Sequence, residues 1–532
     1  MSSNIVTIRD AYRDVVKKFP DKTALIFKDE EFTFTELDSL VGKVAAYFHN
    51  KGLRRNDRVI LYLPHMQEWI SIWLGMQSLG VTVLPITHFY GHDEVSYIAG
   101  DSGVKIIFCS ERNFDNVARA AEDHPFDTII IVGDNYNAES ARKIKEKGTE
   151  LISYTDVMTE TSPPPEIKVE PTDLAEILYT GGTTGPPKGV PLSNILLLEA
   201  MNVKRDEFAT VLPRGTGVAL QGAPLFHILG KEVGFSSLLA GDALILLAKM
   251  DIDTILSAVE KYRVTTFFGT PTLCRMILEH ENVDKYDCSS FVYVFTAGEA
   301  MPKEVNKQWT ERFKNPTYSG YGSTETCGGI TGIPVGEDYP AGTSGKVVPT
   351  KQVVLVNPDT MEPVAPGEPG EILVTSEHMV KGYLNKPVET AAHFVEMDGK
   401  TWYKTGDIVR FDENGWIFFV DRSVDMIKHK GYRVAATKIE AVIYKHEAVH
   451  ECCVVGVPDE KEGEKIKAFI VTKAGYDGVK AEDITKWCEE TLSSYEIPNY
   501  VEFRKELPKS VVGKILRRKL RDEEREKIAR QN

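Results

Sequence analysis

Apolar runs of strand length alternate with amphipathic helical stretches along much of the chain. DRVILYLP, VTVLPI, VKIIFCS and TIIIVGD occur in this rhythm between residues 57 and 134, with MQEWISIWLGMQSLG between the first two. The rhythm returns between residues 217 and 313, where GVALQGA, ALILLA, TTFFGTP and FVYVFTAG are separated by helical segments such as IDTILSAVEKY and PKEVNKQWTERF. Such alternation is typical of parallel sheets covered by helices on both faces. We therefore expect an α/β fold with two sheet layers.

The pattern changes after residue 350. Short strands are expected at KQVVLV, GEILVT, IVRF and WIFFV, and Asn414-Gly415 between the last two is a strong hairpin signal. After Asp421 a mixed pattern of helices and strands continues to a charged final helix. We predict a large N-terminal domain of layered sheets with a small β-rich region over residues 1–421. A small mobile α+β domain is expected over residues 422–532.

Length and charge limit the class of protein. A chain of 532 residues exceeds what one hydrophobic core usually organises, so two or more domains are expected. The net charge of -15 argues against indiscriminate binding to nucleic acid or to an anionic membrane. The charged N-terminal stretch predicts neither a signal peptide nor a spanning helix, so we expect a cytoplasmic protein without integral membrane association. The seven cysteines have no metal-ligand spacing and are expected to be reduced.

Residues 178–190, LYTGGTTGPPKGV, form a glycine-rich stretch after the strand-like LAEIL. Its glycines allow close backbone approach, its threonines offer hydroxyls and its lysine offers a mobile cation. These groups suit a polyphosphate, which an acidic protein must hold by a local positive potential. The spacing is not that of the ordinary P-loop, and a flexible turn is the alternative for a lone stretch of this kind. The candidate ATP-binding residues here are Thr180, Gly181, Gly182, Thr183, Thr184, Gly185 and Lys188.

The string closely resembles the signature of the adenylate-forming superfamily, which includes acyl-CoA synthetases, nonribosomal-peptide adenylation domains and firefly luciferase. The resemblance extends from FTFTELD at 32–38 to GKILRRKL at 513–520, with the motifs in the family's order. It implies an AMP-forming acyl-CoA synthetase, an acid–thiol ligase that uses ATP, Mg²⁺ and coenzyme A. Such an enzyme first makes an acyl-adenylate and pyrophosphate, and then transfers the acyl group to coenzyme A.

Three further motifs extend the resemblance in the large domain. In PLFHILG at 224–230 it places His227 beside the acyl pocket, although a lone histidine is more often structural. In TAGEAMP at 296–302 and GYGSTET at 320–326 it implies an adenine pocket, an α-phosphate contact from Thr324 and a Mg²⁺ ligand in Glu325. The nucleotide-binding residues implied by these two motifs are Gly298, Glu299, Ala300, Tyr321, Gly322 and Thr324.

The remaining motifs lie towards the C-terminus. WYKTGD ends in Asp407, whose carboxylate suits the two ribose hydroxyls, and Arg422 is implied to contact the ribose or a phosphate. IKHKGYRV resembles the loop of the thioester step, with Gly431 beside the pantetheine arm and Lys430 near coenzyme A phosphates, although a solvated basic loop is equally expected for the lysine. Lys514 has the place of the family's adenylation lysine. The resemblance assigns catalysis to Lys514, Thr183, Thr184 and Glu325.

The sequence also departs from the family pattern, because Val424 replaces the usual hinge Asp or Lys, and Ala436 and Lys438 alter the segment that follows. Two alternatives stay open: an adenylating enzyme that loads a separate carrier protein, and a non-catalytic binding relative. The expected partners are a carboxylic acid, which can be fatty, aromatic or alicyclic, together with ATP and coenzyme A. The oligomeric state, including a homo-oligomer, is open, as is the direction of the reaction in the cell.

Overall fold

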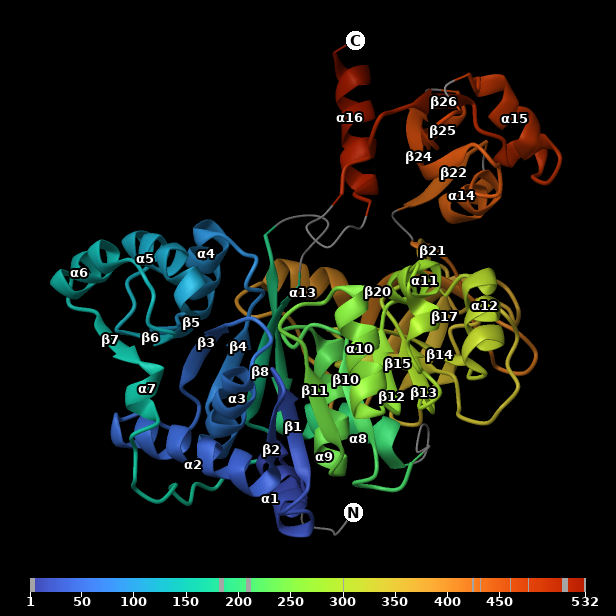
Figure 1. Ribbon diagram of the computed structural model, residues 1–532. Coiled ribbons are helices and arrows are strands. Elements are labelled where there is room, and N and C mark those ends of the chain that lie inside the picture. Colours follow the sequence, from blue (N-terminus) through green and yellow to red (C-terminus); the bar gives the residue numbers. More distant parts are fainter. Residues whose placement is uncertain are drawn as a thin grey trace. The chain divides into compact units, whose positions relative to one another are not determined.

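The computed structural model is mixed α/β, with a large N-terminal sheet domain and a small C-terminal domain, as the sequence predicted (Figure 1). It describes residues 5–180, 186–206, 212–299, 301–422, 425–430, 432–459, 461–476, 478–509 and 515–530. The chain divides into two compact units. The first contains Met1–Val353, Val374–Tyr403 and Gly415–Ile417, and the second contains Val354–Leu373, Lys404–Asn414 and Phe418–Asn532.

The first sheet of the large unit has seven strands in the order β7-β6-β5-β3-β4-β8-β9. All neighbouring strands are parallel except β9, which runs antiparallel to β8. Strands buried on both faces read as continuous apolar runs, which explains the pattern between residues 57 and 134. The strands are β3 (Arg58–Tyr62), β4 (Thr82–Pro85), β5 (Ile106–Ser110), β6 (Thr128–Val132), β7 (Glu150–Ser153), β8 (Leu174–Thr180) and β9 (Lys188–Ser193).

Helices cover both faces of this sheet. α4 (His92–Ser102), α5 (Phe114–Asp123) and α6 (Ala138–Glu146) pack on one face, together with Ile177 of β8. Because successive strand residues point to opposite faces, Glu176 faces the other side, where Trp73 of α3 (Gln67–Leu79) contacts it. α2 (Phe34–Asn50) begins at a capping box of Thr33 and Glu36 and packs with α3. The shorter elements nearby are η1 (Glu111–Asn113) and α7 (Tyr154–Val157).

The second sheet has nine strands in the order β16-β15-β14-β13-β12-β10-β11-β1-β2. The six strands from β14 to β1 are parallel, whereas β2, β15 and β16 pair antiparallel with their neighbours. Its strands are β1 (Thr23–Phe27), β2 (Glu30–Thr33), β10 (Val218–Gln221), β11 (Ala243–Leu246), β12 (Thr266–Gly269), β13 (Tyr293–Thr296), β14 (Thr317–Ser323), β15 (Gly328–Gly332) and β16 (Lys346–Val347).

One face of the nine-stranded sheet packs against three helices, α10 (Ile252–Tyr262), α11 (Pro271–Glu279) and α12 (Lys303–Phe313), around the buried Trp309. The motif PLFHILG leads into a π-helical turn, η2 (Gly230–Phe235), which continues into α9 (Ser236–Ala240). The other helices of this region are α1 (Ile8–Lys18), α8 (Asn194–Asp206) and η3 (Val283–Lys285). The large unit therefore consists of two helix-covered parallel sheets, as the alternating pattern predicted.

The β-rich region has five strands in the order β17-β18-β20-β19, with β21 beside β20. The hairpin predicted at Asn414-Gly415 joins β20 and β21, and Gly415 has a positive φ of 80°. A left-handed backbone is accessible to glycine without a steric penalty. The elements are β17 (Gln352–Val356), β18 (Gly370–Thr375), α13 (Pro387–His393), β19 (Phe394–Met397), β20 (Lys400–Phe411) and β21 (Ile417–Arg422).

The C-terminal part of the second unit is a five-stranded sheet with its own core. Its order is β23-β22-β25-β24 with β26 beside β25, and α14 and α15 pack on it. The elements are β22 (Met426–His429), β23 (Tyr432–Ala435), α14 (Ala436–Ile443), β24 (Val449–Asp459), β25 (Gly463–Thr472), α15 (Ala481–Glu489), η5 (Ser494–Glu496), β26 (Tyr500–Phe503) and α16 (Arg517–Ala529). The mixed helix and strand pattern predicted after Asp421 is confirmed.

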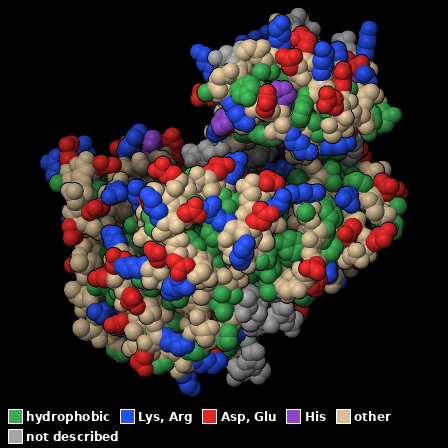
Figure 2. All heavy atoms as spheres, turned by 45° about the vertical axis from the view of Figure 1, so that its right-hand side comes forward, with side chains coloured by type: hydrophobic (Ala, Val, Ile, Leu, Met, Phe, Trp, Pro, Cys, Tyr) green, Lys and Arg blue, Asp and Glu red, His purple; other side chains and the backbone are tan. Residues whose placement is uncertain are grey.

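The surface carries both signs of charge. On the face drawn in Figure 2, the described acidic and basic side chains are interspersed. Of the described helices, none combines the length and apolar character needed to cross a bilayer. All seven cysteines lie in described segments, where they are buried and form no disulfide.

Candidate active site

The sequence motifs gather where parallel strands end. PLFHILG follows β10, TAGEAMP follows β13, and GYGSTET occupies the end of β14 in the same nine-stranded sheet. Because these strands are parallel, their carboxyl ends lie at one edge, which is where open α/β sheets bind ligands. The glycine-rich stretch follows β8 of the seven-stranded sheet. The fold therefore gives each motif of the large unit a strand-end position.

The glycine-rich stretch connects the antiparallel strands β8 and β9, rather than a strand and a helix. Thr180 and Lys188 are register partners at the base of this connection, and the Thr180 hydroxyl donates to the Lys188 carbonyl at 3.4 Å. This geometry differs from an ordinary P-loop, in agreement with the spacing of its residues. The predicted residues Gly181, Gly182, Thr183, Thr184 and Gly185 lie outside the described residues.

Tyr383 joins two of the predicted site residues. Its hydroxyl donates to Glu325 Oε1 at 3.0 Å, and Lys188 Nζ lies 4.8 Å from the centroid of its ring. Both Glu325 and Tyr383 are buried. Burial and the negative charge of Glu325 raise the pKa of Tyr383, so its hydroxyl stays protonated and remains a donor at neutral pH. The structure thus brings the lysine of the glycine-rich stretch and the carboxylate of GYGSTET onto one tyrosine.

No motif in the sequence identified Tyr383. It precedes α13, more than 50 positions after Glu325 in the chain, and its neighbours Gly382 and Leu384 belong to no recognised pattern. The contact arises because residues 374–403 return to the large unit after the β-rich region has begun. Proximity of this kind depends on tertiary structure and leaves no local signal.

The GYGSTET turn is braced from within. The buried Thr326 hydroxyl donates to the carbonyl of Gly328 at 2.8 Å and accepts from the Ser323 amide at 3.2 Å. Tyr321 pairs with Thr331, and the predicted Gly322 pairs with Gly329 across the β14–β15 hairpin. Thr324 is also buried. The turn that holds Thr324 and Glu325 is therefore fixed by its own hydrogen bonds.

The candidate adenine residues follow β13. Gly298 has a φ of 88°, and among the described residues no atom lies within 4 Å of where its Cβ would be. Glu299 accepts a hydrogen bond from the Thr272 hydroxyl at 2.8 Å, which fixes its carboxylate to the start of α11. Gly298 thus borders open space at the strand end. Ala300 lies outside the described residues.

The acyl-side motif contains an exposed histidine and contacts a partly buried one. His227 is exposed, and its Nδ1 accepts from the backbone amide of Leu229 at 3.2 Å. His65, which the sequence analysis did not select, accepts from the backbone amide of Leu225 through Nε2 at 3.1 Å. Burial lowers the pKa of His65 to about 4, so its imidazole is neutral and can act as an acceptor. His65 therefore holds the start of PLFHILG in place.

Two predicted residues lie together in the second unit. Arg422 Nε is 3.4 Å from Asp407 Oδ1, with the carboxylate buried and the guanidinium half exposed. The Asp407 backbone amide donates to the Thr405 hydroxyl at 3.0 Å. The sequence analysis expected Asp407 at the ribose and Arg422 at the ribose or a phosphate, and in the structure the two residues form an ion pair.

The predicted coenzyme A residues are only partly described. Lys430 has a φ of 51° and its Nζ lies 3.6 Å from Glu462 Oε1. Gly431, Lys514 and the hinge position Val424 lie outside the described residues. Close to Lys514 in sequence, Arg517 donates to both carboxylate oxygens of Glu440, at 2.8 and 2.7 Å. The segment that follows Lys514 is thereby anchored to α14.

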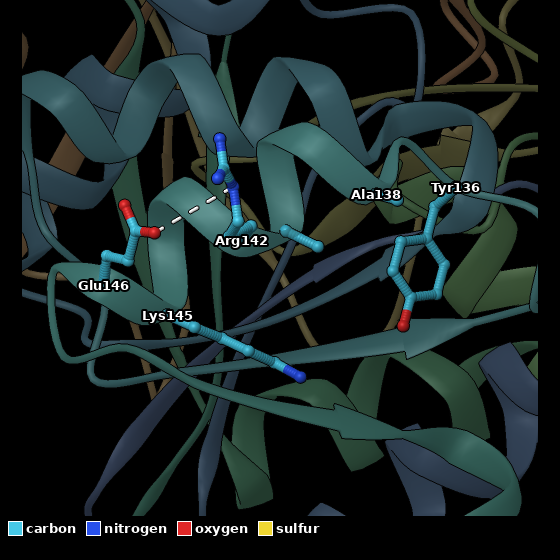
Figure 3. Close-up of a pocket in the computed structure, with 6 residues that line it drawn as sticks. Tyr136, Ala138, Arg142, Lys145 and Glu146 are labelled. Atoms are coloured by element: carbon cyan, nitrogen blue, oxygen red, sulfur yellow. Dashed lines mark ion pairs between the residues drawn. The ribbon is translucent and has the colours of Figure 1, made fainter.

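A pocket on α6 is separate from these motifs. It is lined by Tyr136, Ala138, Ala141, Arg142, Lys145 and Glu146, and Arg142 and Glu146 form an ion pair at its rim (Figure 3). None of these lining residues belongs to a predicted site. The strand-end cluster around Tyr383 is therefore the stronger candidate for the chemistry.

Comparison with known proteins identifies the family of the chain. The family model of AMP-binding enzymes matches residues 12–384, and the model of the AMP-binding enzyme C-terminal domain matches residues 438–514. The chain is 32% identical over 538 residues to a long-chain-fatty-acid–CoA ligase of Bacillus subtilis (strain 168), covering 98% of this chain and 95% of that protein. It is 29% identical over 529 residues to 4-coumarate–CoA ligase 1 of Arabidopsis thaliana, covering 97% and 92%.

A solved structure shows the same likeness. The anthranilate CoA ligase AuaEII in complex with anthranoyl-AMP superposes with a TM-score of 0.85 at 25% identity, covering 98% of both chains. The family match covers well over half of the chain. The two named relatives are CoA ligases, and the chain aligns with nearly the whole length of each. The chain therefore belongs to the AMP-binding enzyme family and is an acid–thiol ligase related to the acyl-CoA and aryl-CoA ligases.

Proposed function

We propose that this protein is an AMP-forming acyl-CoA synthetase, which converts a carboxylic acid and ATP into acyl-AMP and pyrophosphate and then transfers the acyl group to coenzyme A. The observation that carries the proposal is Tyr383 between Lys188 and Glu325. Lys188 supplies a cation at the glycine-rich connection, and Glu325 supplies a carboxylate that contacts the same tyrosine. A metal-bound triphosphate needs both kinds of group. The cation faces phosphate oxygens and the carboxylate faces the metal.

The chemistry needs ATP because hydroxide is a poor leaving group, whereas AMP leaves readily from an acyl-phosphate anhydride. The substrate carboxylate attacks the α-phosphorus in line, the bond to the β-phosphate oxygen breaks, and pyrophosphate departs. Catalysis of such a step is mainly positioning and stabilisation of charge. We assign this task to Thr183, Thr184 and Lys514, with Thr324 at the α-phosphate.

The residues present fit a magnesium ion. Mg²⁺ binds through one or two carboxylates together with substrate phosphates, and Glu325 supplies a carboxylate whose Oε1 is held by the Tyr383 hydroxyl. A carboxylate has further acceptor capacity beyond that bond, so Glu325 can hold the ion without losing Tyr383. When bound, the metal would neutralise charge on the phosphates.

For the nucleotide, we assign the adenine to Gly298, Glu299, Ala300 and Tyr321, and the ribose to Asp407. The open space beside Gly298 supports the first assignment. Asp407 pairs with Arg422 in the second unit, so ribose binding to this carboxylate would replace the ion pair. Arg422 would then be available for a phosphate.

For the second half-reaction, we assign the thiol path to Gly431 and phosphate contacts to Lys430. Lys430 now pairs with Glu462 at 3.6 Å, a separation at which a surface ion pair contributes little and can be exchanged for a phosphate. Transfer to coenzyme A is supported by the names of the relatives, which are CoA ligases.

The relatives also suggest the class of acid. They act, by their names, on long-chain fatty acids and on 4-coumarate, and the solved relative holds an aromatic acyl-adenylate. We therefore propose a predominantly apolar monocarboxylic acid, fatty or aromatic, whose tail lies along the PLFHILG segment beside His227. The neutral His65 beneath this segment supports an uncharged environment there.

The test is a panel of fatty, aromatic and alicyclic acids supplied with ATP, Mg²⁺ and coenzyme A. We expect acid-dependent release of AMP and pyrophosphate and formation of a thioester with at least one acid. Adenylate formation without any thioester would point to a separate carrier protein as acceptor. Absence of pyrophosphate release with every acid, in folded protein that binds ATP, would favour a non-catalytic relative.

A further inference from the structure

Two adjacent charged residues of the acyl-side segment are buried. Lys231 and Glu232 follow PLFHILG in the π-helical turn Gly230–Phe235, with exposures of 0% and 4%. Lysine and glutamate are rarely buried unless they are paired, and π-helical turns occur often at functional sites. Because successive residues of a helix point in different directions, these two side chains reach different parts of the large unit.

Lys231 reaches the strand that leads to the glycine-rich stretch. Its ammonium pairs with Glu176 of β8, which also accepts from the Trp73 indole, and neither Lys231 nor Glu176 is exposed. The ammonium lies 4.5 Å from the centroid of the Trp69 ring, a cation–π contact in a dry environment. Four residues after Glu176, β8 ends at Thr180.

Glu232 reaches the hairpin that carries GYGSTET. Its Oε1 accepts from the Gly329 backbone amide at 3.1 Å. A Cβ on Gly328 would lie 2.6 Å from Glu232 Oε2, and one on Gly329 would lie 3.0 Å from Oε1. Gly328 also has a φ of 94°. The hairpin backbone therefore closes around the carboxylate in a way that only glycine allows at Gly328.

The two contacts connect three motifs. Through Lys231 the acyl-side segment is tied to β8, the strand that leads to the glycine-rich stretch, and through Glu232 it is tied to the hairpin that holds Glu325. Stability alone is a weak reason for a buried ion pair, because well-packed apolar residues often serve as well. Fixing the relative positions of reacting groups is a functional reason to bury Lys231 and Glu232, because small displacements of reacting groups lower the rate by large factors.

We propose that Glu232 is a positioning residue for adenylation, which holds the Glu325 turn against the acyl-side segment while Lys231 holds the same segment against the strand of the phosphate loop. The inference rests on the proposed function. In this role Glu232 contacts neither substrate nor metal, and it acts by fixing the position of Glu325.

The experiment separates the reach of the Glu232 side chain from its charge. Glu232→Gln keeps an oxygen at the same distance from the Gly329 amide and loses the charge, whereas Glu232→Asp keeps the charge and withdraws the carboxylate by one methylene. A matched control is Glu111→Asp, because Glu111 accepts from the Asn135 amide at 2.8 Å and is packed against Gly133 in the same manner. Glu111 begins the turn η1, directly after β5 of the seven-stranded sheet, and is remote in sequence from every predicted motif.

Two quantities are measured for each variant: the dissociation constant of ATP by calorimetry, with and without Mg²⁺, and the rate of acid-dependent pyrophosphate release. For Glu232→Asp we expect kcat/KM for MgATP to fall about tenfold or more, and the Mg²⁺-dependent gain in ATP affinity to shrink. Glu232→Gln should stay within about threefold of wild type, and Glu111→Asp should be unchanged in both quantities.

A loss in Glu232→Gln as large as the loss in Glu232→Asp would overturn the proposal, because removing the charge at full reach would then matter as much as shortening the side chain. So would a Glu232→Asp variant that matches Glu111→Asp in both quantities. If wild-type protein binds MgATP but releases no pyrophosphate with any acid, the proposed function has failed. The calorimetric comparison still decides whether Glu232 positions the Glu325 turn.

Discussion

Replacing Tyr383 by phenylalanine removes one hydroxyl and keeps the ring. The hydroxyl donates to Glu325 Oε1 at 3.0 Å, whereas the ring face lies 4.8 Å from Lys188 Nζ. Phenylalanine retains a cation–π contact, so the substitution isolates the bond to the carboxylate. Because Glu325 is buried, the lost donor is not readily replaced by bulk water.

The magnitude follows from the kind of bond. A hydrogen bond to a charged group contributes about 1.5–3 kcal/mol, and each 1.4 kcal/mol corresponds to about a factor of ten. If the bond serves to orient Glu325 towards Mg²⁺, Tyr383→Phe should lower kcat/KM for MgATP in pyrophosphate release by about ten- to one-hundredfold. A higher Mg²⁺ concentration should be needed for half-maximal rate.

The assay is pyrophosphate release at saturating acid, over a series of Mg²⁺ concentrations at fixed ATP. Tyr286→Phe is the control, because the Tyr286 hydroxyl donates to Asp253 at 3.1 Å on the exposed surface. It should leave the rate unchanged. A Tyr383→Phe enzyme with normal Mg²⁺ dependence, or an equal loss in both variants, would refute the role given to this tyrosine.

The remaining predictions concern a buried ion pair, a partly buried histidine and the adenylation lysine. Lys231→Met leaves Glu176 without its buried partner and should lower the free energy of unfolding by about 3–5 kcal/mol in denaturant titrations. The double variant Lys231→Met with Glu176→Leu should recover most of the lost stability. A cost below about 1 kcal/mol for the single variant would contradict the role of the pair. His65 has a folded-state pKa of about 4 against 6.5, so the unfolded chain binds the additional proton and stability should decrease by about 3 kcal/mol as the pH falls from 6.5 to 4. In His65→Asn the amide oxygen can still accept from Leu225, and the slope of unfolding free energy against pH should correspond to about one proton fewer. Identical slopes in the two proteins would show that His65 does not cause the pH dependence. Lys514→Ala should lower acyl-adenylate formation by a factor on the order of 10² to 10³, yet it should spare thioester formation from presynthesised acyl-AMP; loss of both half-reactions in folded protein would contradict the assignment.

Much of the fold could be predicted because the signals are local. Buried parallel strands read as apolar runs, so β3 to β6 and β10 to β13 were all recognisable, and Asn414-Gly415 marked its hairpin. The first strand of the nine-stranded sheet was missed. Residues Thr23–Phe27 pair in parallel with β11, more than 200 positions away, and their neighbour in the chain is the antiparallel strand β2, so no local pattern marks them as part of a parallel sheet.

The candidate site shows the same limit. Motifs located Lys188 and Glu325, since each lies in a glycine-rich string with a recognisable order of residues. Tyr383 connects them through a tertiary contact, and no local pattern indicates it. Lys231 and Glu232 are charged residues in a helical stretch, which sequence reasoning places at the surface, whereas long-range pairing buries both.

The most direct test of the central claim is the identity of the nucleotide product. The purified protein is incubated with ATP labelled at the α-phosphate, Mg²⁺, coenzyme A and each acid of the panel, and the labelled products are separated. Attack at the α-phosphorus predicts labelled AMP in amounts equal to the thioester formed, with pyrophosphate released alongside. Labelled ADP as the acid-dependent product would mean that the γ-phosphate is transferred, and it would contradict the account.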